Sequence, residues 1–123
     1  MIKFFAVFLG GGLGSLVRFG IAEAVSPLKS GFPAATFLAN VISCCILGFL
    51  LALVSKSEIS PFIKFLFVTG FCGGFSTFST FTGETFQLFQ NGNWTTALIY
   101  VFSSFLVCLF SLYLGFKIAN LTG

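Results

Sequence analysis

The sequence predicts an all-α integral membrane protein built from four transmembrane helices. Of the 123 residues, 57% are hydrophobic and only 7% are charged, and the mean hydropathy is +1.08. A soluble domain normally has about a quarter of its residues charged, so this chain has too few charges to cover a globule. The charges it does have lie mainly at the ends of long apolar runs, as they do beside membrane spans.

Each apolar run reaches the roughly 20 residues that a helix needs to cross the hydrocarbon. The spans are predicted over residues 4–24, 32–54, 61–89 and 94–116. The second and fourth contain no charged residue, and the third is interrupted by the glycines Gly70, Gly73 and Gly74. The connecting loops are too short to hold a soluble domain, so residues 1–123 are predicted to form a single domain with both termini on one side of the membrane.

The lysines give only a weak signal for orientation. The side that bears the termini collects Lys3, Lys56, Lys64 and Lys117, and the other side has Lys29 and, if it leans outward, Arg18. Under the positive-inside rule this difference is a weak bias, so the chain is expected to be able to insert both ways. The net charge of +3 is spread over loop ends, which indicates membrane orientation and not nucleic-acid binding.

The composition argues against an enzyme. The chain has no histidine or aspartate and only three acidic residues, so the usual catalytic triads and acid–base pairs cannot be assembled. The four cysteines all lie inside predicted spans without metal-ligand spacing, and are interpreted as small buried hydrophobes: Cys44, Cys45, Cys72 and Cys108.

Two polar residues in the first two spans each allow two interpretations. The stretch GGGLGSLVR, residues 10–18, places small residues four apart, which lets helices pack closely. Arg18 at its end could extend to the lipid headgroups or face a water-filled mouth and concentrate anions. The Asn40 amide needs a partner inside the membrane, which could be another helix or an ion passing beside it.

The stretch GFCGGFSTFSTF, residues 70–81, is the most informative. Broken backbone at membrane depth is tolerated only where it is buried in protein or lines a cavity, and its freed carbonyls can bind a cation such as Na⁺. After a break at the glycines, Phe75, Phe78 and Phe81 are expected to form a slanting stripe beside serine and threonine hydroxyls. Such a stripe is ordinarily core, but ring edges carry positive partial charge and, with hydroxyls, can bind an anion moderately, as conduction requires.

The motifs GGGLGSLVRFG, TFLANVIS and GFCGGFSTFSTF resemble those of the CrcB/Fluc family of small fluoride channels. The resemblance spans all four helices in order. It implies an antiparallel, dual-topology homodimer in the cell's inner or plasma membrane, which exports toxic fluoride passively through two pores. A pair of oppositely oriented homologous subunits is left open.

The resemblance also implies roles for individual residues. The fluoride pore would comprise Asn40, Phe78, Phe81, Ser79 and Thr80, with Tyr100 and Ser104 completing a polar track. Arg18 corresponds to a vestibule arginine, and Glu84 to an acidic position near the pore end. A structural Na⁺ at the dimer centre would be held by the backbone carbonyls of Gly73 and Ser76.

Two other classes of membrane protein remain as alternatives. A small multidrug exporter would need a glutamate in the middle of the first span, whereas Glu23 lies at its end. In a non-conducting membrane subunit, the glycines and phenylalanines would serve packing alone.

Overall fold

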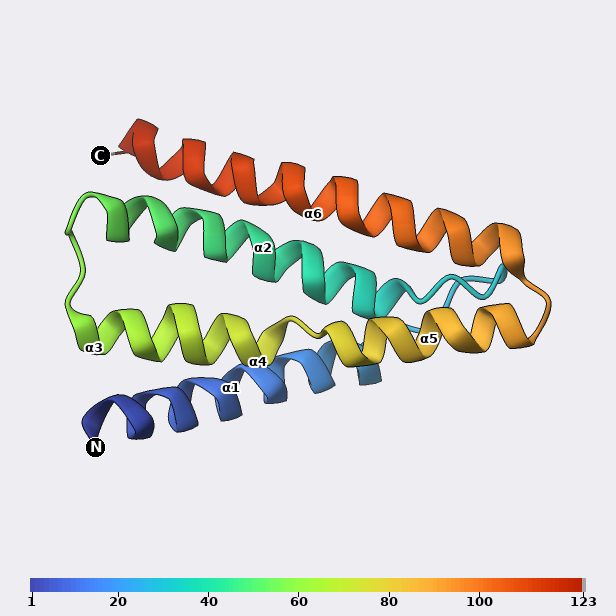
Figure 1. Cartoon of the computed structure of the whole chain (residues 1–123), viewed down its shortest axis with the longest axis horizontal. Helices are drawn as coiled ribbons and strands as arrows, with labels where there is room; N and C mark the ends of the chain where they lie inside the picture. Colours follow the sequence, from blue (N-terminus) through green and yellow to red (C-terminus); the bar gives the residue numbers. More distant parts are fainter. Residues whose placement is uncertain (123) are drawn as a thin grey trace.

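The computed structural model describes residues 1–122 and contains the predicted four apolar helices, the third of them interrupted (Figure 1). The helical segments are α1 (Ile2–Ala24), α2 (Ala34–Ser55), α3 (Pro61–Ile63), η1 (Lys64–Cys72), α4 (Gly73–Phe75), α5 (Phe78–Gln90) and α6 (Trp94–Thr122). All four spans are long and apolar enough to cross a membrane. The last continues beyond its predicted end at residue 116 to Thr122.

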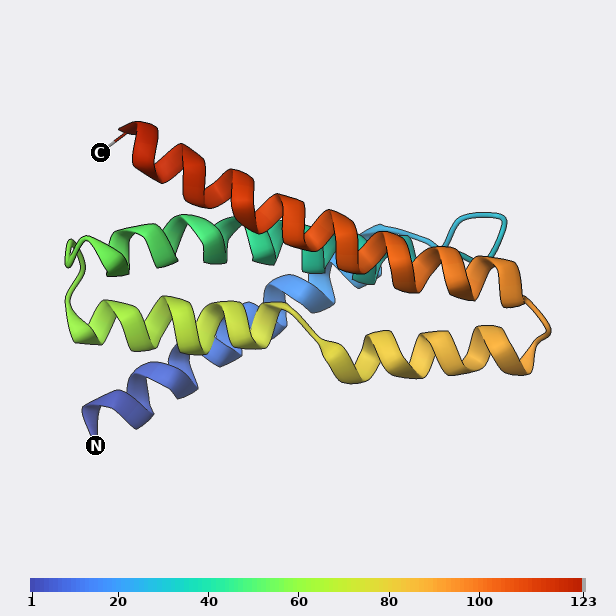
Figure 2. The same ribbon diagram turned by 45° about the horizontal axis from the view of Figure 1, so that its top comes forward.

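The helices form two closely packed pairs. Helix α2 packs along α6, and α1 packs along the first half of the third span, comprising η1 and α4. Figure 2 shows α1 crossing this half-span obliquely, while α5 continues beyond it toward the other end of the bundle. Both termini lie at the same end of the bundle, as the even number of spans requires (Figure 1).

Glycines bring the backbones of both pairs into direct contact. A Cβ at Gly10 or Gly14 of α1 would collide with backbone oxygens of η1, those of Leu66 and Phe71. In the second pair, a Cβ at Gly115 of α6 would collide with the Cys45 carbonyl oxygen of α2. The small residues in the first span therefore act as predicted, by allowing close helix approach.

We expect Gly115→Ala to destabilise the fold, because the added methyl group meets backbone and cannot be relieved by a side-chain movement. Overpacking of this kind typically costs about 1–3 kcal/mol. The matched control is Gly20→Ala, at a helical position with nothing within 4 Å of the added Cβ. There alanine should be neutral or slightly stabilising. Thermal unfolding in detergent measures both, and equal stability of the two variants would contradict the close packing.

The sequence predicted a break of the third span at its glycines, and this position is wrong. Gly70 and Gly74 lie in helical segments that pack against α1, whereas the backbone becomes extended at Ser76 (φ −80°, ψ 152°) and Thr77 (φ −147°, ψ 124°). The physical reason is that Gly70 and Gly74 are used for close approach to α1, while side-chain oxygens of Asn40 and Thr77 replace backbone partners at the break. The segment before it, η1, is a nine-residue π-helix, a rare form often found near functional sites.

The break also separates Phe75 from the other two phenylalanines. Phe75 lies before it, is 2% exposed and packs edge-on against Phe71, with ring centroids 5.6 Å apart. The expected stripe of three rings is therefore wrong, because Phe75 belongs to the core and only Phe78 and Phe81 lie together on α5.

Candidate functional site

Asn40 of α2 replaces the missing helical partners of Thr77. Its Oδ1 accepts a hydrogen bond from the Thr77 backbone N–H at 2.9 Å, and its Nδ2 donates to the Thr77 carbonyl at 3.4 Å. An amide inside the membrane must be paired, and here the half-buried Asn40 side chain satisfies both backbone groups of an extended residue. The helix-to-helix hydrogen bond considered for Asn40 is therefore present, and it fixes the geometry of the break.

Two backbone carbonyls at the break lose their usual helical donors. In a continuous helix the N–H four residues later would donate to each carbonyl. The Thr77 N–H, which would serve Gly73, instead binds Asn40, and the Thr80 N–H, which would serve Ser76, instead binds Oγ1 of Thr77 at 3.2 Å. The carbonyls of Gly73 and Ser76 are thus freed from the helical ladder.

The nearby carbonyls of Gly74 and Cys72 are paired. Arg18 of α1 is half-buried, and its Nε donates to the Gly74 carbonyl at 3.2 Å. The Cys72 carbonyl accepts from the Ser43 hydroxyl at 3.3 Å and from both the hydroxyl (2.8 Å) and the backbone N–H (3.0 Å) of Ser76. Arg18 therefore ties the first span to the break, and its predicted role as a vestibule cation stays a prediction.

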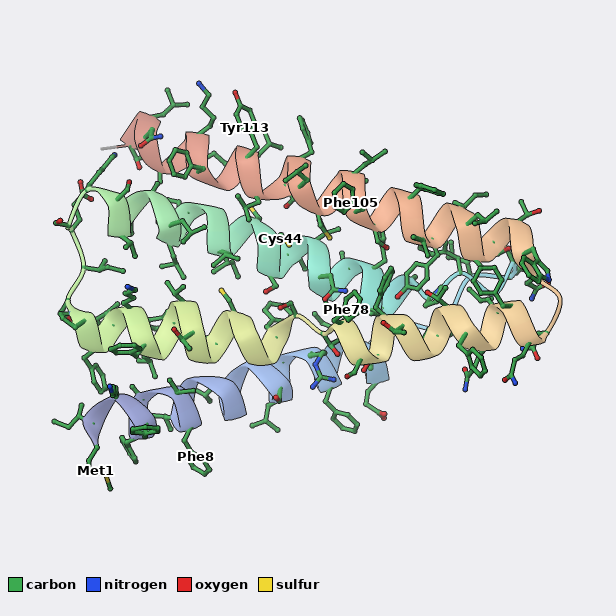
Figure 3. The ribbon with its side chains drawn as sticks, viewed as in Figure 1. Met1, Phe8, Cys44, Phe78, Phe105 and Tyr113 are labelled. Carbon is green, nitrogen blue, oxygen red and sulfur yellow. The ribbon has the colours of Figure 1, made fainter. Side chains whose placement is uncertain are left out.

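A cavity of about 500 Å³ opens beside the break. Its lining comes from three segments, namely α2, the break with the start of α5, and α6, and comprises Asn40, Cys44, Ser76, Thr77, Phe78, Phe81, Val101, Ser104, Phe105 and Cys108. Figure 3 shows the labelled Cys44, Phe78 and Phe105 near the middle of the bundle. The lining contains amide, hydroxyl and aromatic groups and no charged side chain.

The two α5 phenylalanines differ in burial. Phe78 is 78% exposed and Phe81 is half-buried, with ring centroids 6.0 Å apart and planes inclined by 42°. Phe81 also packs against the ring of Tyr100 on α6, at a centroid distance of 4.9 Å. Tyr100 itself is fully buried behind Phe81, outside the cavity lining.

Glu84 lies at the centre of a hydrogen-bonded group formed by three helices. The Tyr100 hydroxyl donates to its Oε1 at 2.9 Å, and the Thr36 hydroxyl of α2 donates to its Oε2 at 3.0 Å. Through Tyr100, this carboxylate helps to hold Phe81 in place. Thr36 was not identified as a candidate site residue from the sequence, because a threonine at the start of an apolar span does not by itself indicate a functional role.

The Ser104 hydroxyl of α6 is buried, lines the cavity and has no hydrogen-bond partner within residues 1–122. A buried hydroxyl without a partner is costly, and it is available to a ligand. Asn40, Phe78, Phe81 and Ser104 are thus brought to one cavity. Ser79 and Thr80 are exposed on the first turn of α5, outside the lining.

Comparison with known proteins assigns the chain to a family. Residues 5–116 match the family model described as CrcB-like protein, Camphor Resistance (CrcB). Relatives named fluoride-specific ion channel FluC include those of Azobacteroides pseudotrichonymphae (39% identical, covering 93% of both chains) and Pyrococcus furiosus (40%, also 93% of both). The relative of the same name from Flavobacterium psychrophilum is 36% identical, covering 98% of both chains. With four membrane-spanning helices in the expected order, the chain therefore belongs to the CrcB family of multi-pass membrane proteins.

Proposed function

We propose that this chain is the subunit of a fluoride-specific ion channel, which exports toxic fluoride passively through the cavity beside the helix break. The observation that carries this proposal is the cavity lining, where the Asn40 amide, the Phe78 and Phe81 rings and the unpartnered Ser104 hydroxyl converge without any charged group. It is supported by the relatives at 36–40% identity, which are named for this activity.

The lining suits weak binding of a small anion. An ion that leaves water must exchange its hydration shell for other dipoles. Positive partial charge is presented to the cavity by the amide N–H₂, the hydroxyl and the ring edges. A formal positive charge in the wall would bind the anion strongly and slow its release, whereas conduction needs several moderate sites. Ser79 and Thr80, exposed beside Phe78, would extend this series of donors toward the solvent.

Dimerisation would enclose the path. In a single chain the cavity is open at the side and Phe78 is largely exposed, whereas an anion in a membrane needs a wall on every side. An antiparallel dual-topology homodimer, permitted by the weak lysine bias, would close two such cavities and form two pores. A paired homologous subunit could serve the same purpose.

A structural Na⁺ is proposed between the two subunits, held by the backbone carbonyls of Gly73 and Ser76. Both carbonyls lack their helical donors, and Gly73 is exposed with nothing within 4 Å of a Cβ built on it. Carbonyl oxygens are ligands of hard cations, and two carbonyls from each subunit would supply four. Within residues 1–122 no cluster of three or more Cys, His, Asp or Glu exists, so a hard cation such as Na⁺ would depend on such backbone oxygens.

Gly73→Val tests this arrangement. The single chain has room for the side chain, so any large effect must come from a partner, and we expect a loss of dimer in detergent with the helical content retained. Gly12→Val is the matched control, because Gly12 is also exposed on a helix with open space around it. A Gly73→Val protein that remains as dimeric as the control, at equal Na⁺ concentration, would exclude a subunit contact at Gly73.

The function itself is tested by reconstituting the purified protein in liposomes loaded with fluoride and chloride. A fluoride electrode should record rapid fluoride loss, while chloride is retained. Proton-coupled uptake of an organic cation would instead indicate a small multidrug exporter. Liposomes as tight to fluoride as protein-free ones would indicate a non-conducting subunit.

A further inference from the structure

Two cysteines, one on α2 and one on α6, lie in the wall of the cavity. Cys44 lies on α2 one turn after Asn40, and Cys108 lies on α6 one turn after Ser104, so each thiol continues the face of a polar cavity residue. Both are half-buried and both line the cavity, and each lies one turn before the point where Gly48 of α2 meets the Leu112 backbone of α6. Figure 3 labels Cys44 on α2, near the middle of the bundle.

The packing of α2 against α6 holds this pair in place. Gly48, one turn after Cys44, and Gly115 of α6 both bring backbone against backbone, so the separation of the two helices is fixed. The other two cysteines are excluded from the cavity lining. The structure thus presents two thiols, preorganised on adjacent helices and open to the cavity, in a chain without histidine or aspartate.

We propose that Cys44 and Cys108 form a two-coordinate site for a soft, thiophilic d¹⁰ cation, of which Cu⁺ is the physiological example and Ag⁺ the stable probe. Thiolates select such ions over hard cations. A thiolate sulfur lies about 2.3 Å from a d¹⁰ ion of zinc's size, so one ion fits between two sulfurs up to about 4.6 Å apart. Because Cys44 and Cys108 each lie one turn before the Gly48–Leu112 backbone contact, their side chains lie at the same level of the two packed helices.

Occupation of this site would also close the anion path, and that part of the proposal rests on the proposed function. When both thiols bind one monovalent cation, two S–H protons pass to water and two sulfur–metal bonds form, so the bound group carries one net negative charge. A fixed negative charge in the cavity wall, beside Ser104, repels fluoride, and in a low-dielectric interior this repulsion is strong. The ion also fills part of the cavity.

Binding is tested first, without reference to transport. In a protein carrying Cys45→Ser and Cys72→Ser, titration with Ag⁺ in chloride-free detergent buffer should give one ion per chain and raise the unfolding temperature. Adding Cys44→Ser or Cys108→Ser should weaken Ag⁺ binding at least about 100-fold, because one of the two sulfur ligands is lost. Equal Ag⁺ affinity with and without Cys44 would overturn the site, and Cys108→Ala provides a second variant if a serine impairs folding.

Closure of the anion path by the bound ion is tested by fluoride efflux from liposomes. For each protein, the efflux rate with Ag⁺ is compared with the rate of the same protein without Ag⁺. Micromolar Ag⁺ should slow efflux at least tenfold when both thiols are present and leave it within twofold when Cys44 or Cys108 is serine. If Ag⁺ binds the two thiols but leaves fluoride efflux unchanged, closure of the anion path is wrong and the metal site still stands. A protein that conducts no fluoride would refute the proposed function, while the binding titration would still decide the site.

Discussion

Phe81→Ile should reduce fluoride efflux by at least two orders of magnitude while the protein remains folded and monodisperse. Isoleucine keeps most of the apolar volume, so the packing cost is about 1.5 kcal/mol or less. The change removes the ring edge from the cavity and leaves alkyl hydrogens of negligible polarity. A barrier raised by about 2.7 kcal/mol slows passage about 100-fold, and Phe78→Ile should behave alike. Fluoride-electrode efflux from liposomes measures the rates.

Two phenylalanines serve as controls for this change. Phe102 of α6 is exposed and outside the cavity lining, so Phe102→Ile should leave both stability and efflux nearly unchanged. Phe75 is buried in the core before the break, so Phe75→Ile should lower the unfolding temperature and slow efflux much less than Phe81→Ile. If Phe81→Ile instead matches Phe102→Ile in efflux, the rings serve packing and the edge-on anion site is wrong.

Asn40→Leu should also slow fluoride efflux by about two orders of magnitude. Leucine removes the N–H₂ donor from the cavity and leaves the Thr77 N–H without its acceptor. A lost hydrogen bond to a charged partner costs about 1.5–3 kcal/mol, and an unsatisfied buried donor about 1–3 kcal/mol. The break should therefore be less well fixed, with a lower unfolding temperature, while the four helices still assemble.

Ser111→Ala is the matched control for Asn40, because Ser111 also makes an interhelical hydrogen bond to backbone, from α6 to the Val41 carbonyl of α2 at 2.8 Å. Ser111 lies outside the cavity lining. The control should lose a comparable amount of stability and keep its fluoride efflux. Similar efflux in both variants, measured in the same liposomes, would show that Asn40 acts only as a structural link.

Much of the fold was accessible from the sequence, because membrane spans depend on length and hydropathy. The four spans and the glycine contacts of α1 follow from patterns that act along one helix. The position of the break was not accessible in the same way. Glycines are the obvious weak points, yet whether a glycine breaks a helix or packs against another depends on the neighbouring helix. Asn40 and Thr77, from different spans, make the decisive contact.

The candidate site was predicted only in part for the same reason. Asn40, Phe78, Phe81 and Ser104 were identified and lie at one cavity. The contribution of Thr36, which binds Glu84, depends on how two spans face each other and has no local signature. The cysteines were interpreted as small buried hydrophobes, which holds for Cys72 only. No motif indicates that Cys44 and Cys108, both half-buried, line one cavity from two helices.

The reversal potential of the current through the purified protein in a planar bilayer tests the central claim, passive and fluoride-selective conduction, most directly. A tenfold gradient is worth about 1.4 kcal/mol, and 100 mV about 2.3 kcal/mol per elementary charge. Under a tenfold fluoride gradient with equal chloride and pH, the current should therefore reverse at about 60 mV, with the sign set by fluoride. Replacing chloride on one side should leave that value unchanged. A reversal potential that follows the chloride or proton gradient, or a bilayer without current, would contradict a passive fluoride channel.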